Sequence, residues 1–122
     1  MQELPSHNLA DLRREYTTRG LHRADLHRDP VEQFRRWFGE AQAARLIEPN
    51  AMTLATADAT GRVTARTVLL KAYDTSGFVF FTNLESVKAR QIRENPCVAL
   101  LFAWLPLERQ VAITGRAERI SA

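Results

Sequence analysis

The feature that most restricts the fold is a change of period at Ala51, where helical spacing of apolar residues gives way to strand-like runs. The first three runs cover residues 51–58, 63–73 and 78–83. The gaps between them hold the turn sequences ATG (59–61) and DTSG (74–77). Strands joined by turns this short pair antiparallel, so we expect a sheet built from hairpins.

The rest of the chain extends this expected sheet. Residues 97–104 and 109–120 form two more strand-like runs, with Gly115 as a bulge or bend in the last one. A short helix over residues 86–95 is predicted between the third and fourth strands, with Ser86 as its N-cap and Pro96 beyond its end. Apolar runs in most strands of so small a sheet favour closure. The predicted fold is mainly β: an antiparallel β-barrel with flanking helices.

A first helix is predicted from Asp29 to near Leu46. The sequence Asp-Pro-Val-Glu (29–32) combines an N-cap acid, a proline at the first helical position and a glutamate at the third, the signature of a capping box. Apolar residues at helical spacing then predict a core-packing face: Val31, Phe34, Trp37, Phe38 and Ala41. Residues 1–28 are polar, which predicts a mobile arm outside a domain of residues 29–122. That arm is either a frayed terminus or a functional segment.

Composition narrows the possible ligands. The 17 Lys and Arg are interspersed with 14 Asp and Glu, a balance that suits a small phosphorylated ligand as well as it suits nucleic acid. A single cysteine, Cys97, excludes an internal disulfide, and the three histidines lack metal-ligand spacing, so we expect no metal. No apolar run reaches the ~18 residues of a membrane span and the start lacks a signal-peptide core, which predicts a cytoplasmic protein without membrane contact.

Two segments hold candidate ligand-binding residues. In residues 66–71 (RTVLLK), strand alternation gives each face apolar residues and one cation, Arg66 or Lys71. A cation fixed beside an apolar wall suits a phosphate joined to a flat ring, although both cations could simply reach solvent. Lys88 follows Ser86 in the first turn of the second helix, where its charge opposes the helix dipole. That misplaced cation invites a functional explanation, although surface lysines often break this rule.

The segments RTVLLKAYD, GFVFFTNLESVKARQIRENP, LLFAW, LERQV and GRAER resemble the flavin-binding core of pyridoxine (pyridoxamine) 5'-phosphate oxidases. The early segment LRREYTTRGL resembles the N-terminal arm of the same family. The likeness runs in order over nearly the whole chain, so it is more specific than any single motif. It implies an FMN-binding split barrel that forms a homodimer, with FMN in the cleft between subunits.

The resemblance also implies a set of site residues. The implied FMN contacts are Arg66, Thr67, Val68, Leu69, Leu70, Lys71, Phe81, Thr82, Lys88 and Gln110. Arg66 and Lys88 would bind the FMN phosphate, Lys71 would lie near the flavin ring and the substrate, and Gln110 would reach the partner's flavin. The implied substrate contacts are Arg13, Arg14, Glu15, Tyr16 and Lys71. No catalytic residue is assigned within this chain.

The reaction implied is oxidation of pyridoxine or pyridoxamine 5'-phosphate to pyridoxal 5'-phosphate, with O2 as acceptor and H2O2 as product. Two departures from the family stand out. Val87 lies where the family commonly has an arginine, which predicts weaker FMN binding. The chain ends at Ala122, before the family's remaining substrate ligands, which predicts slow turnover by this chain alone.

Three alternatives remain. The chain could be a non-catalytic FMN-binding module, or a split-barrel flavin reductase, although a reductase has no need of the arm sequence LRREY. A nucleic-acid-binding barrel would need exposed aromatic residues among its cations. Phe78, Phe80 and Phe81 instead have the pattern of core residues, which disfavours that class.

Overall fold

The computed structural model describes residue 9 and residues 21–120, and the arm residues 13–16 lie outside this range. Its helices and strands follow in the order α1 (Pro30–Ala43), β1 (Ala51–Ala57), β2 (Val63–Asp74), β3 (Gly77–Phe80), α2 (Val87–Glu94), β4 (Cys97–Trp104) and β5 (Arg109–Arg116). Two short 3-10 turns, η2 (Arg23–Asp25) and η3 (Leu105–Leu107), precede α1 and join β4 to β5. The predicted sequence of helices and strands is confirmed.

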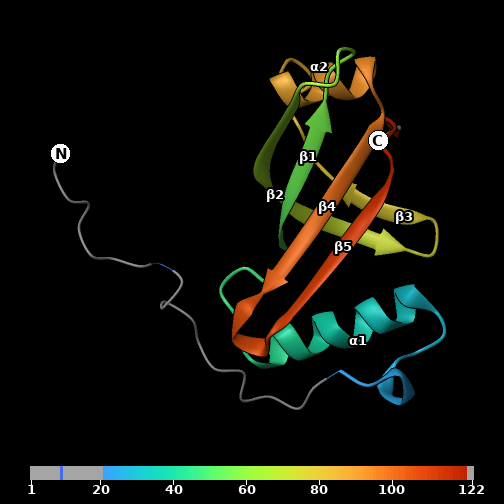
Figure 1. Ribbon diagram of the computed structural model, residues 1–122, viewed down its shortest axis with the longest axis vertical. Coiled ribbons are helices and arrows are strands. Elements are labelled where there is room, and N and C mark those ends of the chain that lie inside the picture. Colours follow the sequence, from blue (N-terminus) through green and yellow to red (C-terminus); the bar gives the residue numbers. More distant parts are fainter. Residues whose placement is uncertain (1–8, 10–20, 121–122) are drawn as a thin grey trace, which may run out of the picture.

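The five strands form one antiparallel sheet in the order β3-β2-β1-β4-β5, with β3 and β5 at its edges. The sheet is strongly curled: Figure 1 shows the end of β2 and all of β3 crossing behind β4 and β5. Helix α1 lies across one end of this half-barrel and α2 across the other. The predicted fold class, a mainly antiparallel split barrel with flanking helices, is confirmed.

A β-bulge in β2 produces much of this curvature. The pairing register between β2 and β3 shifts between Leu70 and Ala72. Leu70 is buried and Tyr73, three positions further along, packs on an interior ring, so strict alternation has been broken once. The bulge predicted at Gly115 is wrong, because β4 and β5 pair in regular register through that residue. A bulge is needed in β2 because this strand passes from pairing with β1 to pairing with β3. β5 pairs with β4 alone, so it needs no such bend.

The core lies between the sheet and α1, and Phe34 is its centre. This side chain is 3% exposed, and its ring centroid lies 5.0 Å from that of Tyr73, 5.1 Å from that of Phe78 and 5.0 Å from that of Phe102. The contacted rings belong to β2, β3 and β4, so one helical residue packs against both layers of the curled sheet. Edge-to-face aromatic contacts of this kind stabilise beyond the area they bury.

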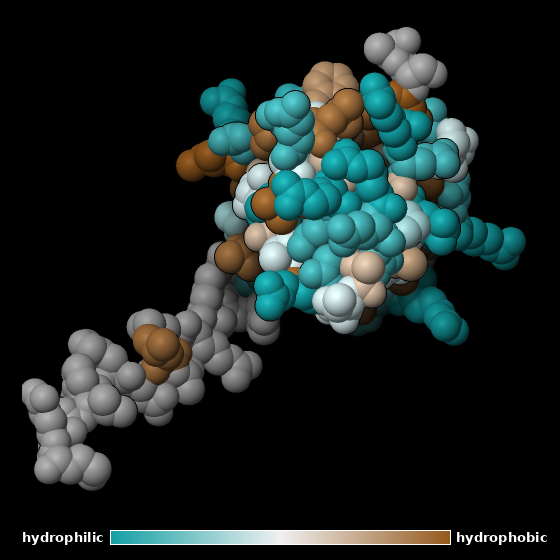
Figure 2. All heavy atoms as spheres, turned by 90° about the horizontal axis from the view of Figure 1, so that it is seen from above, coloured by the Kyte–Doolittle hydropathy of each residue, from teal (hydrophilic) through white to brown (hydrophobic). Residues whose placement is uncertain are grey.

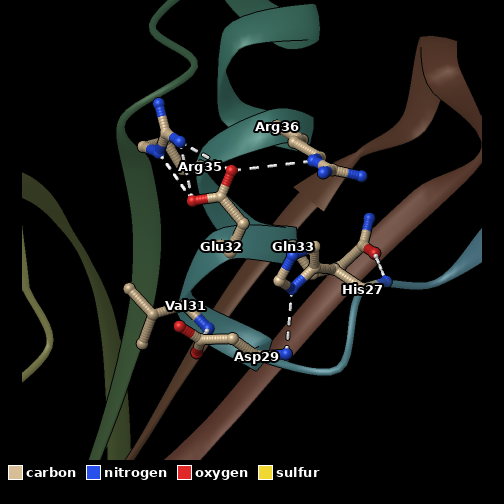
Figure 3. A network of polar contacts seen from close by, with 7 residues as sticks. All are labelled: His27, Asp29, Val31, Glu32, Gln33, Arg35 and Arg36. Atoms are coloured by element: carbon tan, nitrogen blue, oxygen red, sulfur yellow. Dashed lines mark hydrogen bonds and ion pairs between the residues drawn. The ribbon is translucent and has the colours of Figure 1, made fainter.

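Helix α1 begins with a partly formed capping box (Figure 3). Asp29 Oδ1 accepts a hydrogen bond from the backbone N–H of Val31 at 3.0 Å, which confirms Asp29 as the N-cap. The reciprocal bond predicted from Glu32 is wrong: the Asp29 N–H donates to His27 Nδ1, and Glu32 pairs with Arg35. Hydrogen bonds from Arg35 lower the pKa of the Glu32 carboxyl below its ordinary value. The acid still suits the positive end of the helix dipole.

The C-terminal end of α1 comes earlier than the predicted Leu46. Arg45 takes a left-handed conformation with φ 57°, its N–H donates to the Gln42 carbonyl, and the Leu46 N–H donates to the Ala41 carbonyl. These two bonds form a Schellman motif, which closes a helix and turns the chain away. Sequence favours glycine at such a position, so an arginine there gave no signal.

A polar and aromatic clamp fixes α1 to the far edge of the sheet. Arg109, the first residue of β5, pairs with Glu40 and lies with its guanidinium 4.8 Å from the centre of the Trp37 ring. Trp104 Nε1 donates to the Pro49 carbonyl at 2.9 Å, which ties the end of β4 to the loop after α1. The C-terminal half of α1 and the loop after it are therefore held where β4 ends and β5 begins.

The β1–β2 and β2–β3 turns are stabilised in the same way, by an aspartate carboxylate. Asp58 Oδ1 accepts from the backbone and hydroxyl of Thr60 and from the backbone of Arg62, at 2.7–2.9 Å. Asp74 Oδ1 accepts from the backbone and hydroxyl of Ser76, both at 2.7 Å. These hydrogen bonds, the hydroxyl ones first, lower the pKa of both carboxyls, which keeps them ionised and the turns closed at neutral pH.

We predict that Phe34→Ala lowers the free energy of unfolding by about 3–5 kcal/mol, because the lost ring leaves a cavity among aromatic side chains that cannot collapse. Urea denaturation followed by tryptophan fluorescence measures the change. Ile47→Ala is the matched control, since that side chain is 94% exposed and its removal should shift stability by less than about 0.5 kcal/mol. Equal effects of the two substitutions would contradict the assignment of Phe34 to the centre of the core.

Candidate functional site

The most organised polar cluster surrounds Arg66 on the inner face of β2. Its Nη1 donates to the Leu54 carbonyl at 3.2 Å and to Thr56 Oγ1 at 2.7 Å, and its Nη2 donates to Thr64 Oγ1 at 2.5 Å. The two hydroxyls donate in turn to Gln91 Oε1, at 2.5 Å from Thr56 and 2.7 Å from Thr64. Antiparallel pairing sets Leu54 opposite Arg66 and Thr56 opposite Thr64, so the sheet register builds this cluster.

Arg66 retains unused binding capacity. A guanidinium has five N–H donors, and the described contacts use three of them. Its hydrogen-bond partners are neutral oxygens, and no carboxylate among the described residues lies within ion-pair distance. Partial burial lowers the pKa of the guanidinium, which nonetheless stays charged at neutral pH. The arrangement is a fixed cation that still lacks a counter-ion within the described part of the chain.

The start of α2 supplies a second cation. Ser86 caps the helix by accepting from the Ala89 N–H at 3.2 Å. Lys88, in the first turn, is half-buried and makes no hydrogen bond or ion pair with any described residue. Gln91 lies three residues further along, and this spacing gives Lys88 and the Arg66 cluster the same side of α2. Figure 2, which looks onto the α2 end, shows a mostly hydrophilic surface with hydrophobic groups at its margin.

The loop between β3 and α2 connects to this cluster and to Lys71. Thr82 Oγ1 lies 3.4 Å from Ser86 Oγ, which places a hydroxyl beside the helix cap. Phe81 is 73% exposed, and Lys71 Nζ lies 5.8 Å from the centre of its ring. A cation at this distance is attracted by the ring face. The expectation that Phe81 belongs to the core is therefore wrong; Phe78 packs on Phe34, as expected.

A shallow hollow lies at the bulge of β2. It encloses about 300 Å³ and is lined by Phe38, Leu70, Lys71, Ala72 and Tyr73. The bulge leaves both Lys71 and Ala72 exposed, because two consecutive residues there face outward. Aromatic walls beside one mobile cation can accept a planar, negatively charged molecule.

The sequence-predicted residues fall on two faces of the sheet. Arg66, Val68 and Leu70 face the interior, whereas Thr67 and Gln110 are exposed on the outer face. Leu69, two positions after Thr67, is on the same outer face and is half-buried. The structure thus connects Arg66, through Gln91, with the helix α2 that carries Lys88. It also brings Thr82 to Ser86 and Lys71 to Phe81. It does not bring Gln110 to either cation, and the predicted substrate contacts Arg13, Arg14, Glu15 and Tyr16 lie outside the described residues.

Sequence reasoning missed Thr56, Thr64 and Gln91. A threonine in a strand is typical β-forming composition, so neither threonine stood out. A signal was available for Thr56, which continues the inward series of Met52 and Leu54 and is 1% exposed. A polar residue at a core position needs a partner, and its partner is Gln91, which is 6% exposed.

The donor set around Arg66 and Lys88 fits a phosphate. It offers a guanidinium with spare N–H donors, an ammonium without a partner among the described residues, and the positive end of α2. Within the described residues no group of three or more His, Cys, Asp and Glu side chains could bind a metal. In the same part of the chain, no helix is long and apolar enough to cross a membrane.

The curled antiparallel sheet with one helix across each end places the chain in the split-barrel class of proteins. The crystal structure of PhzG from Burkholderia lata, in complex with tetrahydrophenazine-1-carboxylic acid, has this fold with a TM-score of 0.77. It is 32% identical and covers 80% of this chain and 48% of its own. A pyridoxamine 5'-phosphate oxidase-related, FMN binding protein from Nostoc punctiforme gives a TM-score of 0.63 at 20% identity, over 75% of this chain and 47% of its own, which shows the fold alone.

The family follows from sequence. The sequence model of the pyridoxamine 5'-phosphate oxidase family matches residues 38–122. The pyridoxine/pyridoxamine 5'-phosphate oxidase of Rippkaea orientalis is 61% identical over 114 residues, which are 93% of this chain and 54% of that protein. The oxidase of Cupriavidus necator is 57% identical over 113 residues, 93% of this chain and 53% of that protein. The chain belongs to the pyridoxamine 5'-phosphate oxidase family and spans about half the length of these curated relatives.

Proposed function

We propose that this chain binds FMN and serves the oxidation of pyridoxamine or pyridoxine 5'-phosphate to pyridoxal 5'-phosphate, with O2 as acceptor and H2O2 as product. The observation that carries the proposal is the pair of cations, Arg66 and Lys88, that have no carboxylate partner among the described residues. Arg66 is linked through Thr56 and Thr64 to Gln91, which is on the same helix as Lys88. Membership of the family and identities of 57–61% to proteins named as these oxidases support it.

In this proposal Arg66 and Lys88 bind the FMN phosphate. Arg66 is held rigidly by Thr56 and Thr64, so little conformational entropy is lost when its remaining donors bind an oxyanion. Lys88 adds a flexible point charge, and the start of α2 adds backbone N–H groups. Val87, 56% exposed, offers no charge at a position where the family commonly has arginine. Arg66 and Lys88 would then provide most of the charge that binds the phosphate.

Lys71 and Phe81 would meet the flavin ring and the substrate. Lys71 stands at the rim of the hollow between Phe38 and Tyr73, where a planar ligand can lie against apolar surface while its negative group meets the ammonium. FMN, when bound, would accept the two electrons and the hydrogen lost from C4' of the substrate, and dioxygen would then be reduced to H2O2. With the amine substrate, water would hydrolyse the resulting imine and ammonia would be released. The task of the chain is to hold the two rings together in a reactive orientation.

A second enzymatic function, flavin-dependent oxidation of another substrate, has one specific observation in its favour. PhzG, 32% identical, was solved with tetrahydrophenazine-1-carboxylic acid. The identities of 57–61% to named pyridoxine/pyridoxamine 5'-phosphate oxidases favour the vitamin B6 substrate. A flavin-binding module without turnover is the remaining alternative, and measurement of peroxide separates it from the oxidase.

We also propose that the chain forms a homodimer through the outer face of the sheet. That face carries small side chains in adjacent strands, and it is exposed at Ala65, Thr67, Ala103, Gln110, Ala112 and Thr114. Small residues leave a flat surface on which a second sheet can pack closely. Gln110 and Thr67 lie on this face, so a partner subunit would contact both residues.

The first prediction for this function is that FMN binds more tightly than riboflavin, because the phosphate meets Arg66 and Lys88. Arg66→Ala should weaken FMN binding by about 1.5–3 kcal/mol and Lys88→Ala by about 1 kcal/mol. Flavin fluorescence titration gives both constants. Arg90→Ala is the matched control, since it removes the same charge from an exposed position on the same helix. Equal affinity of the unmodified chain for riboflavin and FMN would contradict the phosphate site.

The second prediction concerns turnover. With saturating FMN and pyridoxine 5'-phosphate, we expect H2O2 above the background of free FMN, and Lys71→Ala should lower kcat/KM by about tenfold to a hundredfold. A peroxidase-coupled assay measures the rate. Arg62→Ala, in the exposed turn before β2, controls for loss of one positive charge. A chain that binds FMN and gives no peroxide would be the flavin-binding module and not the oxidase.

The third prediction concerns assembly. The unmodified chain should sediment as a dimer at micromolar concentration, and Ala112→Arg should shift it to monomer, because a long cation cannot fit between two closely packed sheets. Thr75→Arg, in the exposed turn before β3, is the control and should leave the dimer intact. A monomeric unmodified chain that still binds FMN tightly would show that the site is not shared.

A further inference from the structure

Gln91 links the frame of Arg66 to the helix that carries Lys88, although its own side chain carries no charge. Its Oε1 accepts one hydrogen bond from Thr56 and one from Thr64, and the same two hydroxyl oxygens accept from Arg66. The four side chains therefore form a closed ring of hydrogen bonds between β1, β2 and α2. All donors and acceptors in this ring are matched in direction.

That direction matters because each threonine hydroxyl has a single hydrogen. When Gln91 accepts that hydrogen, the lone pairs of the hydroxyl oxygen are left to face the Arg66 guanidinium. Without an acceptor at Gln91 the hydroxyls can rotate, and a buried hydroxyl at Thr56, 1% exposed, loses its acceptor. Gln91 therefore fixes the orientation of the frame that holds Arg66.

Gln91 also fixes where α2 lies. Its side chain is 6% exposed, and its amide oxygen reaches two strands from the middle of α2. Lys88 lies three residues before it on the same side of the helix. A shift of α2 would thus move Lys88 relative to Arg66, and the ring of hydrogen bonds opposes such a shift.

We infer that Gln91 is a positioning residue for phosphate recognition, which sets the guanidinium of Arg66 and the ammonium of Lys88 at a spacing that one phosphate group can span. The inference rests on the proposed function, in which that phosphate belongs to FMN. In this role Gln91 does not contact the flavin phosphate itself. It acts through Thr56, Thr64 and the position of α2.

The test compares FMN with riboflavin, which lacks the phosphate, on the full chain. Gln91→Met keeps the length of the side chain and removes the acceptor. We expect it to weaken FMN binding about tenfold and riboflavin binding less than about twofold, so that the preference for FMN falls. Arg90→Met, one position earlier and exposed, should change neither constant. A role in folding alone would weaken both flavins equally, which would overturn the inference.

A mutant cycle supplies the second measurement. If Gln91 acts through Arg66 and Lys88, then adding Gln91→Met to the Arg66→Ala, Lys88→Ala double variant should weaken FMN binding no further. A further loss in that double variant would show that Gln91 acts independently of the two cations and would overturn the inference.

Thr64→Val and Thr64→Ser cover the case in which Gln91→Met does not fold, since Thr64 is partly exposed. The valine should lower the preference for FMN and the serine should keep it; equal behaviour of the two would also overturn the inference.

These outcomes separate the inference from the proposed function. If the unmodified chain prefers FMN and Gln91→Met keeps that preference, the phosphate site stands and the role of Gln91 falls. If the unmodified chain does not distinguish FMN from riboflavin, the phosphate site itself fails.

Discussion

The bend of β2 between Leu70 and Ala72 is the constraint on which the rest of the structure depends. β2 pairs with β1 over its first part and with β3 over its last part, so it belongs to both layers of the curled sheet. A flat strand of this length would carry β3 away from β4 and leave Phe34 exposed on one side. Because the bulge turns the strand, the rings of Tyr73 and Phe78 reach Phe34 from one side while Phe102 reaches it from the other. The same bulge therefore curves the sheet and closes the aromatic core around Phe34.

The same strand carries a charge that the fold compensates incompletely. A guanidinium removed from water loses hydration, and here three hydrogen bonds to neutral oxygens replace part of it. A carboxylate in place of Gln91 or Thr56 would have compensated the charge more fully and left less attraction for an external anion. Neutral acceptors hold Arg66 in position without neutralising it. Such a site binds an oxyanion more strongly than a mobile surface arginine can, because the geometry is already fixed.

Much of the fold could be predicted because local signals and tertiary contacts agree. Turn sequences at 59–61 and 74–77 and the strand periods around them gave the hairpins, and both turns are held by the aspartate that precedes them. The bulge could not be placed, because it depends on how three strands share one curved surface. Gly115 looked suitable from its residue type alone, whereas the bulge lies at Lys71, which has no such signal. The end of α1 was missed for a similar reason, since Arg45 occupies a position where glycine is usual.

The candidate site was predictable to the extent that charge stands out in an apolar strand. Arg66, Lys71 and Lys88 were found in this way, but the neutral frame of Thr56, Thr64 and Gln91 was not, because threonine and glutamine have many ordinary places in a domain. The alternation of side chains along β2 also separates the FMN contacts that the family resemblance implies. Neighbours in one strand face opposite sides of the sheet, so Arg66 and Thr67 cannot face the same side.

That division bears on how a shared site could be built. The interior face presents Arg66 to the α2 end, and the outer face presents Thr67 and Gln110 to whatever covers the sheet. A ligand that touches both sets must pass around the edge of a strand, or meet the second set on another molecule. In the proposed homodimer, a second subunit packed on the outer face would bring other side chains to Thr67 and Gln110 without any change in the strand. Within one half-barrel, a ligand at Arg66 would reach the outer face only around an edge of the sheet, because the paired strands separate the two faces.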